Sequence, residues 1–186
     1  FVTVNLAAIL AKLQNLPWVA SAQVRKVWPD TVNIIINEQI VSAIWNDAGL
    51  LNKKGVVFAA VKDYNGALDQ PKLYGPAGKQ RQLLWVLGEL GEVLQPLNIG
   101  IAQLKMTRLI SYQLVLRNGL VIYLGHKNIL TRLKQFVRVY PKIAGSAAQV
   151  NYIDLRYSSG MAVNWRVKPV FKVTVGSDQH GQKANR

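Results

Sequence analysis

Apolar and polar positions alternate in a way that predicts a small first unit, made of one helix and one hairpin. The stretch "NLAAILAKLQNL" carries apolar residues at helical spacing and ends at Pro17. Two alternating runs follow, "VASAQVRKVW" and "VNIIINEQIVSAIW", joined by a turn at 28–31 with proline in its favoured second place. Because Val32, Ile34 and Ile36 share one face of the second run, we expect the hairpin to pack on the helix. A unit of about 45 residues is small for an independent core.

A second unit begins near Asn46 and is richer in short strands. The run "GLLNKKGVVF" predicts a hairpin, and the Pro- and Gly-containing "YNGALDQPKLYGPAG" predicts a surface loop. A helix is predicted over 80–95, with an apolar stripe made of Leu83, Leu84, Leu87, Leu90 and Leu94. The segment "IAQLKMTRLISYQLVLRNGLVIYLG" alternates through three antiparallel strands, the last two joined by Asn118-Gly119. The clearest helix covers 127–144, with one apolar stripe made of Ile129, Leu130, Leu133, Phe136, Val137, Tyr140 and Ile143. The run "VNYIDLRYSSGMAVNWRV" supplies two more strands.

These patterns predict an α+β fold. Residues 1–45 form a helix plus a hairpin, and residues 46–168 form a mainly antiparallel β domain with two helices. Residues 169–186 are polar and basic, and we expect them to be disordered. We expect the tryptophans to serve packing, with Trp18 and Trp85 in the core.

A strong positive charge accompanies this fold. Lysine and arginine total 23 against 9 acids, a net charge of +14, which favours an anionic contact such as nucleic acid, lipid headgroups or an acidic partner. The outer face of the helix over 127–144 carries no acid and holds Lys127, Arg132, Lys134, Arg138 and Lys142. This face is either a docking surface for phosphate or anionic lipid, or the ordinary solvated side of a core-packed helix. The sequence shows no clean pattern of basic and aromatic residues typical of nucleic-acid recognition.

Motifs for catalysis, metal binding and cofactor binding are missing from the sequence. The chain has no cysteine, and its two histidines, His126 and His180, have neither the spacing nor the carboxylate neighbours of zinc sites. No phosphate-binding loop and no Gly-x-Ser-x-Gly elbow is present. We therefore expect neither an enzyme nor a cofactor. No run reaches the roughly 18 apolar residues that a membrane span needs, and a first residue Phe1 rather than methionine favours a fragment of a longer protein.

Five short pieces give a resemblance to a known family. "LPWV", "VRKVWPDTVNI", "WND", "LYGP" and "YIDLRYSSG" occur in the order and separation that resemble the FtsQ/DivIB family of bacterial division proteins, over Phe1 to Trp165. The resemblance implies a short cytoplasmic tail, one inner-membrane helix, a POTRA domain and a larger periplasmic β domain. It implies that residues 1–45 are the C-terminal part of the POTRA domain, and that the membrane anchor is absent from this chain.

The resemblance also implies a function without turnover. Members act as divisome scaffolds that bind the FtsB and FtsL pair through a C-terminal edge strand, and link early and late division proteins at the septum, with the POTRA part contacting other division proteins. The positions that match the family's partner-binding residues are Arg156, Tyr157, Ser159, Gly160 and Trp165. Ser158 stands where some relatives carry an acid, so a contact made by that carboxylate is absent.

Three alternatives remain open from the sequence. A basic nucleic-acid-binding module would show a steep salt dependence. A POTRA-type chaperone would normally carry several POTRA repeats, whereas at most one is present here. For the last strand itself, the alternative is that Trp165 closes the sheet core, Arg156 is solvated, and the tail from Arg166 covers the edge in the free protein.

Overall fold

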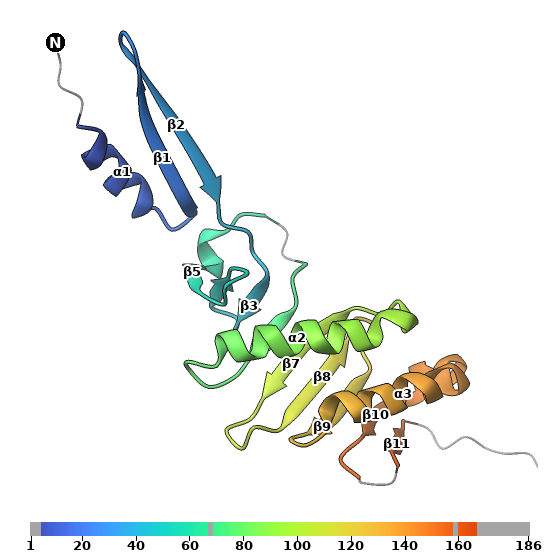
Figure 1. Cartoon of the computed structure of the whole chain (residues 1–186). Helices are drawn as coiled ribbons and strands as arrows, with labels where there is room; N and C mark the ends of the chain where they lie inside the picture. The colour runs from blue at the N-terminus through green and yellow to red at the C-terminus, as the bar shows by residue number, and fades with distance from the viewer. Residues whose placement is uncertain (1–4, 67–68, 158–159, 167–186) are drawn as a thin grey trace, which may run out of the picture.

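A computed structural model describes residues 5–66, 69–157 and 160–166. The chain forms a two-stranded sheet with one helix, followed by a nine-stranded sheet with two longer helices (Figure 1). This arrangement confirms the α+β prediction. The tail 169–186, for which disorder was predicted, lies outside the described residues.

The first unit holds α1 (Leu6–Gln14), β1 (Val19–Val27) and β2 (Thr31–Glu38). Asn5 caps the helix, its side-chain oxygen accepting a hydrogen bond from the amide of Ala8 at 3.0 Å. All nine residues of α1 are described and none is buried, because the helix packs beside β1 alone. The predicted packing of the hairpin on the helix is confirmed through β1, although Ile34 and Ile36 of β2 remain nearly half exposed. A nine-residue helix over the first strand is too small to cover the second.

The second strand is shorter than its pattern predicted. β2 ends at Glu38, and β3 (Ala43–Trp45) belongs to the nine-stranded sheet, where it pairs with β4 and β6. Residues 43–45 are all buried there. We therefore place the boundary between the two units at 39–42 rather than after residue 45.

The larger sheet has the order β11-β10-β9-β8-β7-β6-β3-β4-β5. Its remaining strands are β4 (Gly49–Leu51), β5 (Val57–Ala60), β6 (Lys72–Tyr74), β7 (Ile101–Met106), β8 (Tyr112–Leu116), β9 (Val121–Gly125), β10 (Val150–Asp154) and β11 (Ala162–Trp165). Most neighbours are antiparallel, whereas the pairs β3–β6, β6–β7 and β9–β10 are parallel. The hairpin predicted at Asn118-Gly119 is confirmed between β8 and β9, with Gly119 at a φ of +84°.

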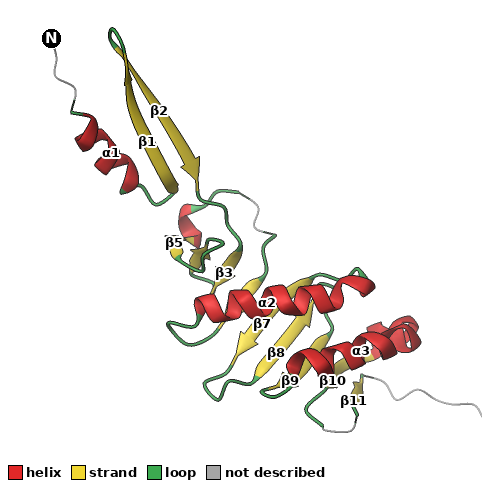
Figure 2. Cartoon of the chain, viewed as in Figure 1, coloured by secondary structure: helices red, strands yellow, loops and turns green. Residues whose placement is uncertain are grey.

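Two helices, α2 (Gln80–Leu94) and α3 (Ile129–Ile143), lie against one face of this sheet and contact each other (Figure 2). Their predicted apolar stripes are confirmed, with the fully buried Leu83, Leu90, Leu133 and Phe136 at the centre of the core. The prediction for Trp85 is wrong, because its side chain is 64% exposed on the outer side of α2.

One strand was predicted as loop. Lys72–Tyr74 forms β6, in the middle of the sheet between β3 and β7, with Leu73 fully buried. Three residues between turns are too few to show a strand period, and parallel pairing to distant segments leaves no local signal.

The "WND" and "LYGP" pieces fasten β6 to the turn after β3. Asn46 exchanges two hydrogen bonds with the backbone of Gly75, at 3.2 and 3.1 Å. Asp47 accepts hydrogen bonds from Lys72 Nζ at 2.8 Å and Tyr74 Oη at 2.7 Å, and the Lys72 contact holds the pKa of this carboxyl below its ordinary range. Asn46 and Asp47 both have positive φ, at +47° and +57°, a conformation that Asn and Asp tolerate better than most residues. These two motifs therefore serve the fold.

The two units meet through Trp18. Its ring stacks on Tyr64 with centroids 5.5 Å apart and meets Phe58 edge-on at 5.1 Å. The amide of Gln39 donates to the Trp18 carbonyl at 2.8 Å. Trp18 therefore packs at the junction of the units.

The core under the last strands can be tested at α3. Phe136→Ala should lower the free energy of unfolding by about 3–5 kcal/mol, because it leaves a cavity between α3 and the sheet. Val139→Ala, a partly exposed position of the same helix, should change it by about 0.5 kcal/mol or less. Urea unfolding followed by circular dichroism measures both. Equal losses in the two variants would contradict this assignment of the core face.

Candidate functional site

The last strand, β11, is an edge of the nine-stranded sheet. Within the described residues it pairs only with β10, in the register Asp154↔Ala162 and Ile153↔Val163. The opposite edge is β5, where Phe58 contacts Trp18 of the first unit. β11 lies at the other end of the sheet from this junction (Figure 1). An edge strand leaves backbone donors and acceptors available to a further strand.

The hydrogen bonds of β10 show which way its amides point. The amide of Leu155 donates to the carbonyl of Tyr123 on β9 at 2.8 Å. Because amides alternate in direction along a strand, the amide of Asp154 faces β11, where Ala162 stands opposite. Asp154 and Ala162 are therefore a hydrogen-bonded pair.

The same alternation holds along β11. The amide of Arg166 donates to the carbonyl of Gln149 at 2.6 Å, so the even-numbered amides of β11 face β10. The amides and carbonyls of Val163 and Trp165 therefore face away from the sheet. These four backbone groups form the open edge, a name we use for them below.

The side chains of β11 lie on two faces of the sheet. Val163 and Trp165 are partly buried and pack against the core cluster, while Ala162 and Asn164 are exposed on the opposite face. Trp165 thus closes the core with its indole, as the alternative reading predicted, while its backbone lies at the open edge. The packing of the indole does not test the predicted partner-binding role of Trp165, which stays a prediction.

Arg156 is oriented by a buried acid. Its guanidinium donates to both Asp154 carboxylate oxygens, with Nη2 to Oδ2 at 2.6 Å and Nε to Oδ1 at 2.9 Å, and its amide donates to Oδ1 at 2.9 Å. Asp154 is only 5% exposed. Arg156 holds the pKa of Asp154 below its ordinary value of 3.8, chiefly through the side-chain hydrogen bond. The guanidinium also lies 5.5 Å from the centre of the Tyr123 ring. Arg156 is therefore an exposed cation with a defined orientation.

Asp154 was missed at the level of sequence. The available signal is an acid two residues before an arginine at the end of a strand, which places both on the same face. That spacing also occurs by chance, so it could not identify a buried ion pair alone.

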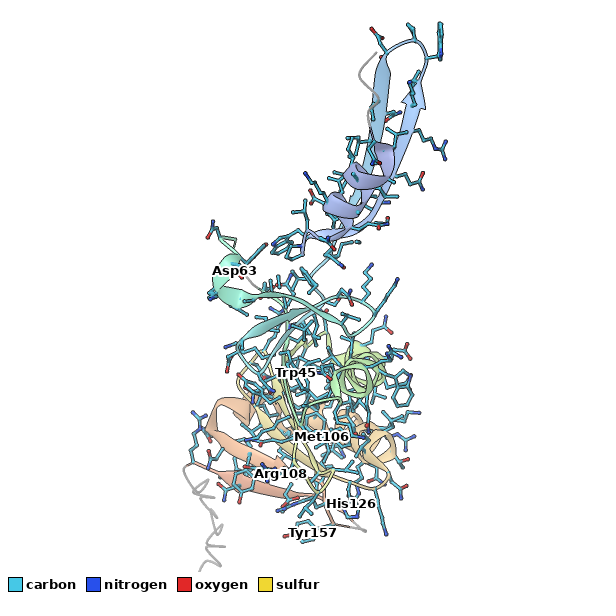
Figure 3. The ribbon with its side chains drawn as sticks, turned by 90° about the vertical axis from the view of Figure 1, so that its left-hand side faces the viewer. Trp45, Asp63, Met106, Arg108, His126 and Tyr157 are labelled. Atoms are coloured by element: carbon cyan, nitrogen blue, oxygen red, sulfur yellow. The ribbon has the colours of Figure 1, made fainter. Side chains whose placement is uncertain are left out.

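Tyr157 and Gly160 lie beside the open edge. Tyr157 is 59% exposed, and with Gly160, Met161 and Ala162 it lines a shallow depression of about 270 Å³. Figure 3 places Tyr157 at the end of the molecule away from the first unit, at the same end as Arg108 and His126. Ser159 lies outside the described residues. The structure thus places Arg156, Tyr157 and Gly160 near the Ala162 end of β11, whereas Trp165 lies at the other end of the strand, opposite Val150.

Basic side chains flank this region. A second depression, of about 390 Å³, is lined by His126, Lys127, Arg132 and Arg156 among others. Arg132 donates to the carbonyl of Leu124 at 3.1 Å, which fixes its position at the base of α3. The surroundings of the strand end are therefore cationic.

The described ranges hold no group of three His, Cys, Asp or Glu placed to bind a metal ion. Over the same ranges, no helix has the length and apolarity required to span a bilayer.

The ion pair gives a pH-dependent contribution to stability. Because the folded-state pKa of Asp154 is lowered, its contribution is fully present above pH 3.8 and is lost as the pH falls through the folded-state value. Asp154→Asn should cost about 1 kcal/mol near pH 7, allowing for the exposed guanidinium, and the difference should narrow below pH 3.8. Denaturant unfolding across this pH range measures it. A difference that stays constant with pH would contradict the ion pair.

Comparisons with known proteins identify the family. The family model "Cell division protein FtsQ/DivIB, C-terminal" matches residues 43–156, and "POTRA domain, FtsQ-type" matches residues 1–39. The first match ends at Arg156, so it does not extend over β11.

Curated relatives agree with this assignment. Cell division protein FtsQ of Vibrio cholerae is 35% identical over 89% of this chain and 63% of its own length. The Escherichia coli protein of the same name is 34% identical over 89% of this chain and 62% of its own length, and that of Coxiella burnetii is 33% identical over 89% and 68%. This chain thus spans less than two thirds of the length of the first two. The resemblance seen in the sequence is confirmed, and the chain belongs to the FtsQ/DivIB family of cell division proteins.

Proposed function

We propose that this chain is a non-enzymatic scaffold of the division machinery, and that it binds the FtsB and FtsL pair by accepting an extended FtsB segment as a further strand beside β11. The observation that carries the proposal is the open edge, the outward amides and carbonyls of Val163 and Trp165. The names of the relatives support a role in cell division. The partner and the mode of binding are our proposal.

Backbone pairing alone would be modest in energy. Each added hydrogen bond contributes about 0.5–1.5 kcal/mol net, and the four groups of the open edge allow about four such bonds. An aromatic anchor in a desolvated contact costs about 2 kcal/mol or more when truncated. Tyr157, exposed next to the strand, is the anchor that this geometry offers. Side chains beside the strand should therefore contribute much of the affinity and the selectivity.

The cations at this end favour an acidic segment. Arg156 is held in place by Asp154 while remaining exposed, and Lys127 lies on the neighbouring depression. Complementary charge at the rim of an interface steers association and selects among partners. An FtsB segment with acids flanking its pairing residues meets both requirements.

The proposed location follows from the same assignment. The parent protein would be bitopic in the bacterial inner membrane, with this portion in the periplasm at the division septum. The first unit would contact other division proteins and so link early and late components. No nucleic acid, metal or cofactor takes part in this proposal.

The structure selects one position for a proline test of strand addition. Val163→Pro removes an outward amide while leaving the amides that pair with β10, so it should abolish binding of a periplasmic FtsB segment. Val163→Ile keeps the amide and an apolar β-branched side chain, and should bind within about threefold of the parent. Calorimetric titration of both variants, after thermal melting confirms their folding, measures the effect. Tight binding by a folded Val163→Pro chain would exclude pairing at this edge.

Side-chain anchors can be tested separately. Tyr157→Ala and Trp165→Ala should each weaken binding of the FtsB segment more than tenfold, about 1.4 kcal/mol. Trp165→Ala should also lower the melting temperature, because the indole packs on the core. Trp85→Ala is the matched control, an exposed tryptophan on α2, and should leave binding unchanged. If the folded Tyr157 and Trp165 variants bind as tightly as the parent, the docking edge lies elsewhere.

A further inference from the structure

The turn between β1 and β2 presents an exposed tryptophan at the far end of the molecule. Trp28 is 85% exposed, and Val27 beside it is nearly half exposed. Figure 1 shows this hairpin projecting away from the nine-stranded sheet, so the turn forms a protruding tip. Among the described residues, Trp28 takes part in none of the ring contacts. The packing predicted for the tryptophans does not hold here.

We infer that this tip, residues 25–28, is a membrane contact in which Trp28 inserts into the interface of an anionic bilayer. Tryptophan concentrates at the boundary between headgroups and acyl chains, because its ring is largely apolar while its N–H can stay hydrated. A hairpin turn suits this contact, since Val27 and Thr31 pair across the strands below the indole. The ring can then enter the interface without exposing unpaired strand backbone.

The charges next to the tip select the kind of bilayer. Arg25 and Lys26 are exposed and immediately precede Val27 and Trp28, and Asp30 is the one acid within residues 23–33. Each cation near an anionic surface strengthens partitioning about fivefold. The tip therefore combines an apolar insertion with an attraction to acidic headgroups, the two components of interfacial binding.

The small surface area of the tip favours lipid over a protein as its binding partner. A buried tryptophan contributes about 150–250 Å², whereas a stable protein interface takes about 800 Å² from each partner. A convex turn with one large side chain falls well short of that area. A fluid bilayer needs no matching surface, so a single exposed ring and two cations suffice for a weak, reversible contact.

The other cationic surface lies elsewhere. The basic face of α3 is at the opposite end of the elongated chain, together with β11 (Figure 1). A bilayer at the tip would leave the open edge of β11 accessible to a partner. The contact rests on the proposed location at the inner membrane, but its test uses no FtsB segment, so its failure is distinct from failure of the proposed partner binding.

The test uses vesicles of phosphatidylglycerol and phosphatidylethanolamine, with phosphatidylcholine vesicles for comparison. The whole chain should bind the anionic vesicles in co-sedimentation, more weakly at high salt, and should bind phosphatidylcholine vesicles weakly. Trp28→Ser should lower the partition coefficient about tenfold or more. Trp85→Ser removes an exposed tryptophan from α2 and should leave the partition coefficient unchanged.

Charge reversals at the tip and on α3 provide a second test with a matched control. The double change Arg25→Glu and Lys26→Glu should lower binding about 25-fold or more, because two attractions become repulsions. The same change of charge at Lys134 and Arg138 on α3 should have little effect. Lipids with brominated acyl chains should quench fluorescence of the parent, and this quenching should disappear in Trp28→Ser only.

Three results would overturn the inference. The first is no binding of the parent chain to anionic vesicles at low salt. The second is binding by Trp28→Ser that equals binding by the parent. The third is loss of binding on reversal of Lys134 and Arg138 alone, which would make α3 the lipid-facing surface.

Discussion

The parallel pairing of β10 with β9 is the constraint on which the candidate site depends. Two consecutive parallel strands cannot be joined by a tight turn and need a crossover of a dozen or more residues. α3 and the 3-10 helix Ala144–Gln149 supply this crossover, and the apolar side of α3 covers the sheet that it bridges. β11 then returns antiparallel on the outside of β10 and becomes the edge. The crossover helix therefore builds the core and, within the part of the chain that the structure describes, leaves one side of the last strand unpaired.

An open edge is a liability that proteins usually limit. β11 has only four residues, its register against β10 is interrupted between Val150 and Tyr152, and the oriented charge of Arg156 lies beside it. Short length, irregularity and charge all disfavour unspecific strand pairing. Under the proposed function, the same features would make binding depend on contacts beyond the backbone, such as one at Tyr157. Protection against aggregation and selectivity for the proposed partner would then have the same physical origin.

Local patterns predicted the parts of the fold that local physics determines. The stripe of α3, the Asn118-Gly119 turn and the alternation of β7 to β9 follow from periods of 3.6 and 2, and the structure confirms them. Periodicity carries no information on which strands pair at a distance. It therefore missed β6, attached β3 to the wrong sheet, and could not show that three pairs are parallel. It also placed Trp85 inside, because an apolar residue next to a stripe differs from a member of the stripe only by rotation around the helix.

The candidate site was less accessible to local pattern than the fold. An arginine, a tyrosine and a tryptophan near a terminal strand are common, and only the family resemblance singled them out. The structure adds what no pattern contains: the acid that orients Arg156, and the direction of each amide along β11. It also shows that the partly buried indole of Trp165 packs against the core, while the backbone of this residue lies at the open edge. A strand that paired there would bind the folded chain and not the unfolded one, and would therefore stabilise the fold by mass action. Under the proposed function, binding and stability at this edge are therefore linked, because one strand supplies both the packed indole and the outward backbone groups.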